Sequence, residues 1–301
     1  MGTIVTVDVV VSSSDAAAEA RADRACEHAL AQFDEVESAC SRFDARSELR
    51  RLCESAGAPV RVSPLLFETL AFAIAVAEAS GGAFDPTVGR VMAARGFNRE
   101  HRTGAIAATD ADVASDISFR DVVLDAGGRT VALRRPLLLD LGAVAKGLAI
   151  DLAARELRRD YEDFAIDAGG DLYAAGRNVS CQPWTIGIRH PRQADAVVDV
   201  VRVSDAAVCT SGDYERRSPI DDGSHLVDGR DRDARHALDA MASVTVIAAS
   251  AMVADALATA AFALGADEGR AFLEAQGVEG LFVSSSLDRT ETAGFSAHVA
   301  S

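Results

Sequence analysis

Residues 243–265 read SVTVIAASAMVADALATAAFALG and join a short apolar segment to a longer one. The first part, SVTVIA at residues 243–248, is predicted to form a strand. The second part predicts a helix from Ala251 to Leu264, and Gly265 marks its end because glycine commonly closes helices. A strand that leads directly into a helix indicates a protein that mixes both elements, in an α+β or an α/β arrangement.

The sequence on either side continues this mixture. Near the N-terminus Val5, Val7, Val9 and Val11 alternate with other residues, which predicts a half-buried strand. Apolar residues then recur every three or four positions from about Asp15 to Cys40, the period of an amphipathic helix. Further helices are predicted from Pro64 to Gly81-Gly82 with Ser63 as N-cap, over 141–159 and after 265, and further strands within 110–139, 164–176, 184–188, 197–203 and 280–286.

The composition excludes several classes of protein. Of the 301 residues, 49% are hydrophobic and 25% are charged, as in ordinary folded proteins. The formal net charge of −16 argues against a nucleic-acid partner, because Lys and Arg supply most of that affinity. The five cysteines form no Cys-x-x-Cys pair and are expected to be reduced. The sequence shows neither a membrane segment nor a signal peptide and predicts a cytoplasmic protein, unless a signal or lipid anchor was trimmed from it.

An anion site is predicted at DLGAVAKG, residues 140–147. The two commonest phosphate-binding loops, G-x-G-x-x-G and G-x-x-x-x-G-K-[ST], do not occur in the sequence. The segment lies between an apolar run and a helix, where free backbone N–H groups and the helix dipole attract anions. Lys146 adds a full positive charge. Alternatively, Asp140 only caps the helix and Lys146 is a solvated surface residue.

A metal site is predicted within the helix 251–264. Asp255 and Thr259 are four residues apart, so they lie on one face of an otherwise apolar helix. A carboxylate and a hydroxyl are hard oxygen ligands of the kind that Mg²⁺ prefers. Alternatively, Thr259 bonds back to the carbonyl of Asp255, whose carboxylate is favoured in the first turn by the helix dipole.

Two further segments carry polar or aromatic groups that suit a ligand. The loop SGGAFDPTVG at residues 80–89 combines two glycines with Phe84, a possible platform for a flat ring, and Asp85, an acceptor. A plain helix end with an Asp-Pro turn is the alternative. His225 and Asp228 lie in SHLVDG, and the histidine could act as a base near neutral pH. A lone histidine is more often structural.

Taken in order, these segments resemble the ApbE family of FAD:protein FMN transferases. The resemblance covers nearly the whole chain and implies an α+β fold with mixed or antiparallel sheets flanked by helices. It also implies one catalytic domain, residues 1–301, made of two interleaved lobes with a soft boundary near 110–140 and FAD in the cleft between them. The matching segments are MGT (1–3), SRFDARSELRRL (41–52), SGGAFDPTVG (80–89), DLGAVAKGLAID (140–151), IDAGGDLYAAG (166–176), TSGDYE (210–215), HLVDG (225–229) and SVTVIAASAMVADALATAAFALG (243–265).

The resemblance implies roles for individual residues. His225 would be the catalytic base, and Asp255 would be both a catalytic residue and a Mg²⁺ ligand, with Thr259 and the carbonyl of Ala143 completing the metal site. Mg²⁺ would offset the charge of the pyrophosphate. The residues that would contact FAD are Met1, Phe43, Ala83, Phe84, Asp85, Asp140, Lys146 and Val227.

The implied reaction transfers FMN from FAD through a phosphoester bond to a Ser or Thr hydroxyl of another protein and releases AMP. The acceptor would carry an Asp-x-x-[Ser/Thr]-Gly-Ala-Thr motif, which this chain lacks. The sequence departs from the family at residues 228–234, where DGRDRDA replaces an Asp-Pro-x-Thr-Gly run. Two alternatives use the same residues: a Mg²⁺-dependent FAD pyrophosphatase that yields FMN and AMP, and a protein that binds FAD without chemistry.

Overall fold

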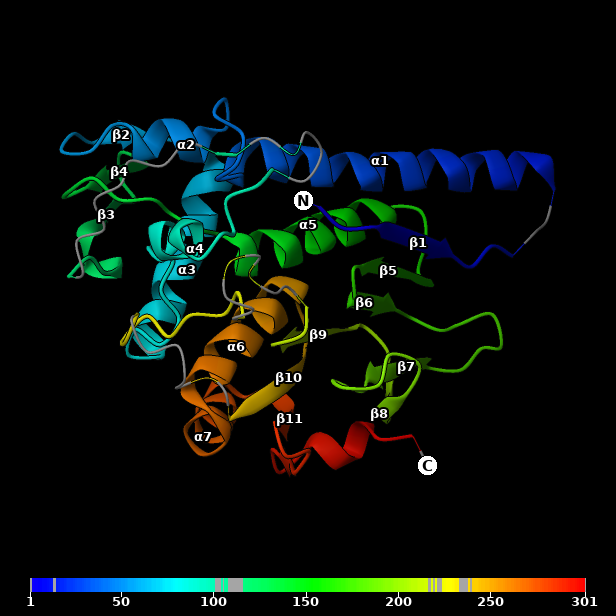
Figure 1. The fold of residues 1–301 in the computed structure, drawn as a ribbon. Coiled ribbons are helices and arrows are strands. Elements are labelled where there is room, and N and C mark those ends of the chain that lie inside the picture. Colours follow the sequence, from blue (N-terminus) through cyan, green and yellow to red (C-terminus); the bar gives the residue numbers. More distant parts are fainter. Residues whose placement is uncertain are drawn as a thin grey trace.

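Figure 1 shows the computed structural model, in which helices and strands form an α+β fold. The structure describes residues 2–12, 15–100, 104, 106–107, 116–215, 218, 220, 224–232, 238 and 240–300. Its helices are α1 (Ala16–Cys40), α2 (Glu48–Cys53), α3 (Pro64–Ala79), α4 (Gly89–Ala94), α5 (Gly142–Leu157), α6 (Ala251–Leu264) and α7 (Ala266–Gln276), with 3-10 turns η1 (Phe119–Asp121) and η2 (Phe295–His298).

The strands form one large sheet and two small ones. In the seven-stranded sheet the order is β1-β5-β6-β9-β10-β11-β12, and every neighbouring pair is antiparallel. The small sheets have the orders β2-β4-β3 and β7-β8. The strands are β1 (Val5–Val9), β2 (Val60–Arg61), β3 (Val122–Asp125), β4 (Thr130–Leu133), β5 (Phe164–Ala168), β6 (Asp171–Ala175), β7 (Trp184–Arg189), β8 (Val197–Val203), β9 (Ala206–Gly212), β10 (Met241–Ala248), β11 (Glu279–Ser284) and β12 (Arg289–Glu291).

Strand β10 is buried along its whole length, including its polar residues Ser243 and Thr245. All eight of its residues are buried, because the strand pairs with β9 and β11 and both faces of the sheet are covered. Val244 and Val246 belong to the main core, whereas Ile247 belongs to a smaller core beneath β7 and β8. Helices therefore cover one face of the sheet, and the β7-β8 hairpin with η2 covers the other.

Helices α5 and α6 are held together at two points close to the first turn of α6. Gly147 of α5 lies so near Ala251 of α6 that a Cβ built on it would be 2.3 Å from the carbonyl oxygen of Ala251. Asp151 of α5 accepts hydrogen bonds from the Ser250 hydroxyl and from the N–H groups of Ala251 and Met252. Burial raises the pKa of the Asp151 carboxyl, although these donors oppose the shift. The two contacts fix the position of α6 relative to α5.

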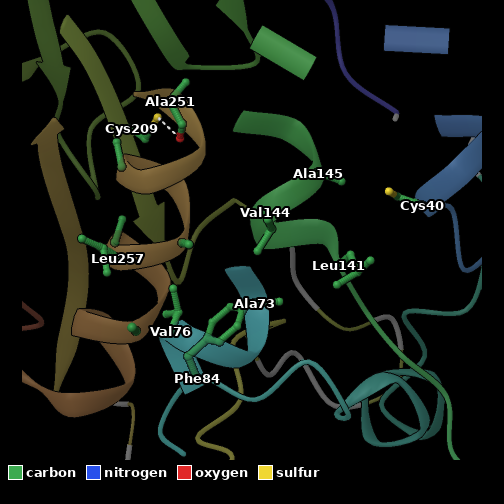
Figure 2. Close-up of a cluster of buried hydrophobic side chains, with 14 of the residues drawn as sticks. Cys40, Ala73, Val76, Phe84, Leu141, Val144, Ala145, Cys209, Ala251 and Leu257 are labelled. Atoms are coloured by element: carbon green, nitrogen blue, oxygen red, sulfur yellow. Dashed lines mark hydrogen bonds between the residues drawn. The ribbon is translucent and has the colours of Figure 1, made fainter. Parts of the chain in front are cut away.

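The main core fills the space between α3, α5, α6 and the sheet. Figure 2 shows its centre, where Phe84 lies beside Ala73 and Val76 of α3, and Cys209 of β9 reaches α6. The Cys209 thiol donates to the carbonyl of Ala251 over 3.7 Å. This core joins residues from both halves of the sequence.

Most of the elements predicted from the sequence are confirmed. Asp15 and Ser63 cap α1 and α3 as their side chains accept backbone N–H groups, and Pro64 is the first residue of α3. The predicted hairpin within 110–139 is the antiparallel pair β3-β4, although residues 108–115 lie outside the described part. The two-residue strand β2 and the six-residue helices α2 and α4 were not predicted, since their repeats are too short to show a period. Among the described helices, none combines the length and apolar composition that a membrane crossing requires.

The cysteines provide a test of this packing. Cys181 is exposed, whereas burial raises the pKa of Cys40 to about 12 and also raises that of Cys209. Because the thiolate is the reactive form, we expect a disulfide reagent at pH 8 to label Cys181 rapidly. Cys40 and Cys209 should react only after denaturation. Replacing Cys181 with serine should remove most of the fast reaction, and fast labelling of Cys40 or Cys209 in the folded protein would contradict the packing.

Candidate functional site

Lys146 lies between two buried carboxylates from different elements. It forms ion pairs with Asp171, the first residue of β6, and with Asp255 of α6, whose Oδ2 is 3.3 Å from Nζ. The exposed fractions of Asp171 and Asp255 are only 3% and 5%. The N–H groups of Thr210 and Gly147 donate to Asp171 and Asp255 over 2.9 Å and 3.3 Å. One lysine faces two carboxylates, so the cluster carries excess negative charge that suits an additional cation.

Further oxygen atoms that could bind such a cation lie along α6, next to this cluster. Thr259 lies one turn after Asp255, and its hydroxyl forms a hydrogen bond of 2.9 Å with the hydroxyl of Ser211 in β9. Ala143 lies one turn before Gly147 in α5. The described residues contain no group of three or more His, Cys, Asp or Glu side chains that could hold a metal. A site with one carboxylate, hydroxyls and carbonyls fits Mg²⁺, which keeps several waters and takes substrate phosphate oxygens.

Asp140 links the start of α5 to the segments around residues 42 and 86. Its carboxylate pairs with the buried Arg42 over 2.6 Å and accepts the N–H of Gly142 over 2.8 Å. The Arg42 guanidinium lies 4.1 Å from the centre of the Phe43 ring. The N–H of Asp140 donates to the carbonyl of Pro86 over 2.7 Å. The predicted contacts Phe43 and Asp140 are thus joined through Arg42, a residue not predicted to belong to the site.

The loop 80–89 forms a second group of predicted residues. The Asp85 carboxylate is 1% exposed and accepts hydrogen bonds from Thr87, from the N–H of Phe119 and from Arg232. Phe84 is buried in the core, so its ring packs against protein (Figure 2). Contact between this loop and FAD stays a prediction.

The segment that contains His225 lies against this loop. The N–H of Gly229 donates to the carbonyl of Ala83 over 3.0 Å, and Val227 is buried. The His225 ring, which is partly exposed, meets the Phe97 ring edge-on at 6.2 Å between centres. His225 and Val227 therefore belong with Ala83 and the rest of that loop.

Met1 lies outside the described residues, but its neighbours are placed. A Cβ built on Gly169 would be 2.0 Å from the hydroxyl of Thr3, so the N-terminal segment packs on the turn between β5 and β6. This turn leads directly into Asp171. Asp171, which pairs with Lys146, was not predicted as a site residue, whereas Ser211 belongs to the polar residues 211–214 of TSGDYE. Both lie inside quoted motifs, but only the pairing of β6 with β9 brings these segments together.

The chain matches one known protein family over most of its length. The sequence model of the ApbE family matches residues 1–282. This chain belongs to the ApbE family. Among curated relatives, an FAD:protein FMN transferase of Treponema pallidum is 36% identical over 301 residues and matches 91% of this chain and 80% of its own length. Another, from Vibrio cholerae, is 31% identical over 262 residues, with 83% of this chain and 76% of the relative covered.

Solved ApbE structures have the same fold. The crystal structure of an ApbE protein from Thermotoga maritima has a TM-score of 0.84 and 28% identity, with 99% of both chains covered. The flavin transferase ApbE from Vibrio cholerae has a TM-score of 0.83 and 26% identity, with 99% of this chain and 96% of that chain covered. The α+β fold and the family expected from the sequence are therefore confirmed.

Proposed function

We propose that this chain transfers FMN from FAD to a Ser or Thr hydroxyl of another protein, in a Mg²⁺-dependent reaction that releases AMP. The observation that carries the proposal is the buried cluster of Lys146 with Asp171 and Asp255 beside the Thr259 hydroxyl. Fixed charges of both signs in one place suit a ligand that brings a pyrophosphate together with a metal ion. The curated ApbE relatives are named FAD:protein FMN transferase, which supports the transfer of FMN from FAD to a protein.

The proposed step forms one bond and breaks another. The acceptor oxygen attacks the phosphorus of the FMN half, the bond from that phosphorus to the bridging oxygen breaks, and AMP leaves with that oxygen. His225 would take the proton of the attacking hydroxyl. Lys146 would stabilise charge on the phosphate oxygens. Bound Mg²⁺, held by Asp255, Thr259 and the carbonyl of Ala143, would polarise the phosphate and neutralise charge.

The other predicted residues would bind and orient FAD. We propose that Met1, Phe43, Asp140 and Val227, with the loop residues 83–85, contact the dinucleotide in a cleft between two interleaved lobes of one domain. Two observations support this grouping: Arg42 joins Phe43 to Asp140, and the N–H of Gly229 bonds to Ala83. The acceptor would be a flavoprotein with an Asp-x-x-[Ser/Thr]-Gly-Ala-Thr motif. The cytoplasmic location stays a prediction.

Incubation of the protein with FAD and Mg²⁺, with and without an acceptor domain, tests the proposal. Mass spectrometry of the acceptor should show covalent FMN, and chromatography should show an equal amount of AMP. Release of free FMN and AMP without modification of the acceptor would indicate a pyrophosphatase instead. Binding of FAD without turnover would indicate a protein that stores or delivers the flavin.

Asp171 supplies a further prediction, because it holds Lys146 opposite Asp255. The substitution Asp171→Asn keeps an oxygen for the N–H of Thr210 but removes the charge that pairs with Lys146. We expect transfer to fall about 10- to 100-fold, as is typical when a partner that orients a site residue is lost. Steady-state rates at saturating Mg²⁺ measure the effect. A rate within a factor of two of the original would show that Asp171 is not needed to hold Lys146 for the reaction.

A further inference from the structure

We propose that Arg232 is a positioning residue that fastens the segment carrying His225 to the loop 80–89. The inference rests on the proposed function, in which both segments contribute to the FAD site. Arg232 lies within residues 228–234, where the sequence departs from the family pattern. Its bond to Asp85 joins two residues that are 147 positions apart in the chain.

The Arg232 guanidinium makes several contacts at once. Nη2 donates to Asp85 Oδ2 over 2.9 Å and to the Thr87 hydroxyl over 2.7 Å, and Nη1 donates to the Thr87 carbonyl over 3.2 Å. The exposed fractions of the two charged side chains are 9% for Arg232 and 1% for Asp85. Because several directional hydrogen bonds accompany this buried ion pair, the two side chains are held in one geometry. Removing either partner would leave a buried charge uncompensated.

The backbone of the same segment is held from two other directions. Arg95, which is buried, donates to the carbonyl of Arg232 over 2.9 Å and to that of Leu226 over 3.3 Å. The N–H of Gly229 donates to Ala83, and a Cβ on Gly229 would be 2.3 Å from the carbonyl oxygen of Gly82. The lack of a side chain at Gly229 therefore permits its backbone to approach that of Gly82, and Arg95 and Arg232 hold the two segments in this position.

These contacts explain how the altered segment keeps a defined shape. Where the family pattern has a proline, whose ring stiffens the backbone, this chain has Gly229. Glycine increases backbone freedom, so the segment needs side-chain contacts to stay ordered. Arg232 supplies them, and it bonds to the carboxylate of Asp85 within the loop predicted to contact FAD. Its effect on His225 and Val227 is indirect.

The test uses three substitutions in the full chain. Arg232→Met removes the charge and keeps the length of the side chain, and Arg232→Lys keeps the charge without the planar group that bridges Asp85 and Thr87. Arg270→Met is the matched control, because Arg270 lies on α7 outside the site and forms an exposed ion pair with Glu274. The measurements are amide hydrogen exchange, FAD affinity by fluorescence, and kcat and KM for transfer.

For Arg232→Met we expect faster exchange confined to residues 83–87 and 224–229, and a loss of about 10- to 100-fold in kcat/KM from misplaced groups. Affinity for FAD should fall in parallel. Arg232→Lys should lie between this variant and the original protein. Arg270→Met should match the original in every measurement.

Wild-type exchange and FAD affinity in Arg232→Met would overturn the proposal, and so would faster exchange spread evenly over the chain. If Arg232→Met does not fold, Thr87→Val replaces it, because it removes the hydroxyl that accepts from the guanidinium and donates to Asp85, and leaves the ion pair intact. Unchanged local exchange in Thr87→Val would then overturn the proposal. Exchange and FAD binding require no turnover, so a protein that binds FAD without transferring FMN would refute the proposed function and still test Arg232.

Discussion

The substitution Asp255→Asn is expected to abolish flavin transfer and leave the fold intact. Asparagine has nearly the same size and keeps an oxygen that can accept the N–H of Gly147. It removes the negative charge that faces Lys146 and the carboxylate proposed to bind Mg²⁺. The loss of a metal ligand removes several kcal/mol of transition-state stabilisation, so we expect the rate to fall about 100-fold or more. Transfer assays over a range of Mg²⁺ concentrations measure the effect.

Asp267→Asn provides the matched control. Asp267 is exposed in the first turn of α7, so the same chemical change occurs at a helix start outside the site. The control should retain full activity and nearly full stability. Full activity of Asp255→Asn would show that this carboxylate takes no part in the reaction. Loss of activity in both variants would point to a general effect of Asp→Asn substitution.

The substitution Gly147→Ala is expected to separate α5 from α6 and to destabilise the protein. The added Cβ would be 2.3 Å from the Ala251 carbonyl oxygen and 2.6 Å from the Met252 Cα. Both are backbone atoms, so no side chain can move aside, and the helices must shift. We expect a loss of about 3 kcal/mol in the free energy of unfolding, at the upper end of overpacking effects. Denaturant unfolding measures this value.

Transfer activity should also fall in Gly147→Ala, because the shift moves Lys146 relative to Asp255. Gly127→Ala is the control, since its added Cβ would meet only an Asp125 side-chain oxygen at 3.4 Å, an ordinary contact. This control should stay within about 0.5 kcal/mol of the original. Equal stabilities of the two variants would contradict the close packing of α5 on α6.

Local sequence patterns were enough to predict most of the regular elements. Asp15, Ser63 and Pro64 mark helix starts by chemistry that acts within one turn, and the structure confirms them. The same holds for the glycine that ends α6, Gly265. Strand β10 was predicted from its apolar run, whereas its central place in the sheet depends on pairing with β9 and β11.

The site was predicted less completely, because its contacts are long-range. The helical spacing of Asp255 and Thr259 indicated a polar face, but nothing local to Lys146 shows that it meets Asp171. The sequence left open that Lys146 is a solvated surface residue, and the structure contradicts this. Arg232 belongs to no recognisable sequence motif. Pairing between distant segments decides such contacts, and a single sequence does not reveal it.

The most direct test of the account is the mass of an acceptor flavoprotein domain after incubation with this protein, FAD and Mg²⁺. The account predicts that the acceptor gains one covalently bound FMN, that AMP appears in equal amount, and that Asp255→Asn abolishes both. An acceptor whose mass is unchanged while FAD is consumed, or while FAD stays bound and intact, would contradict the proposed transfer.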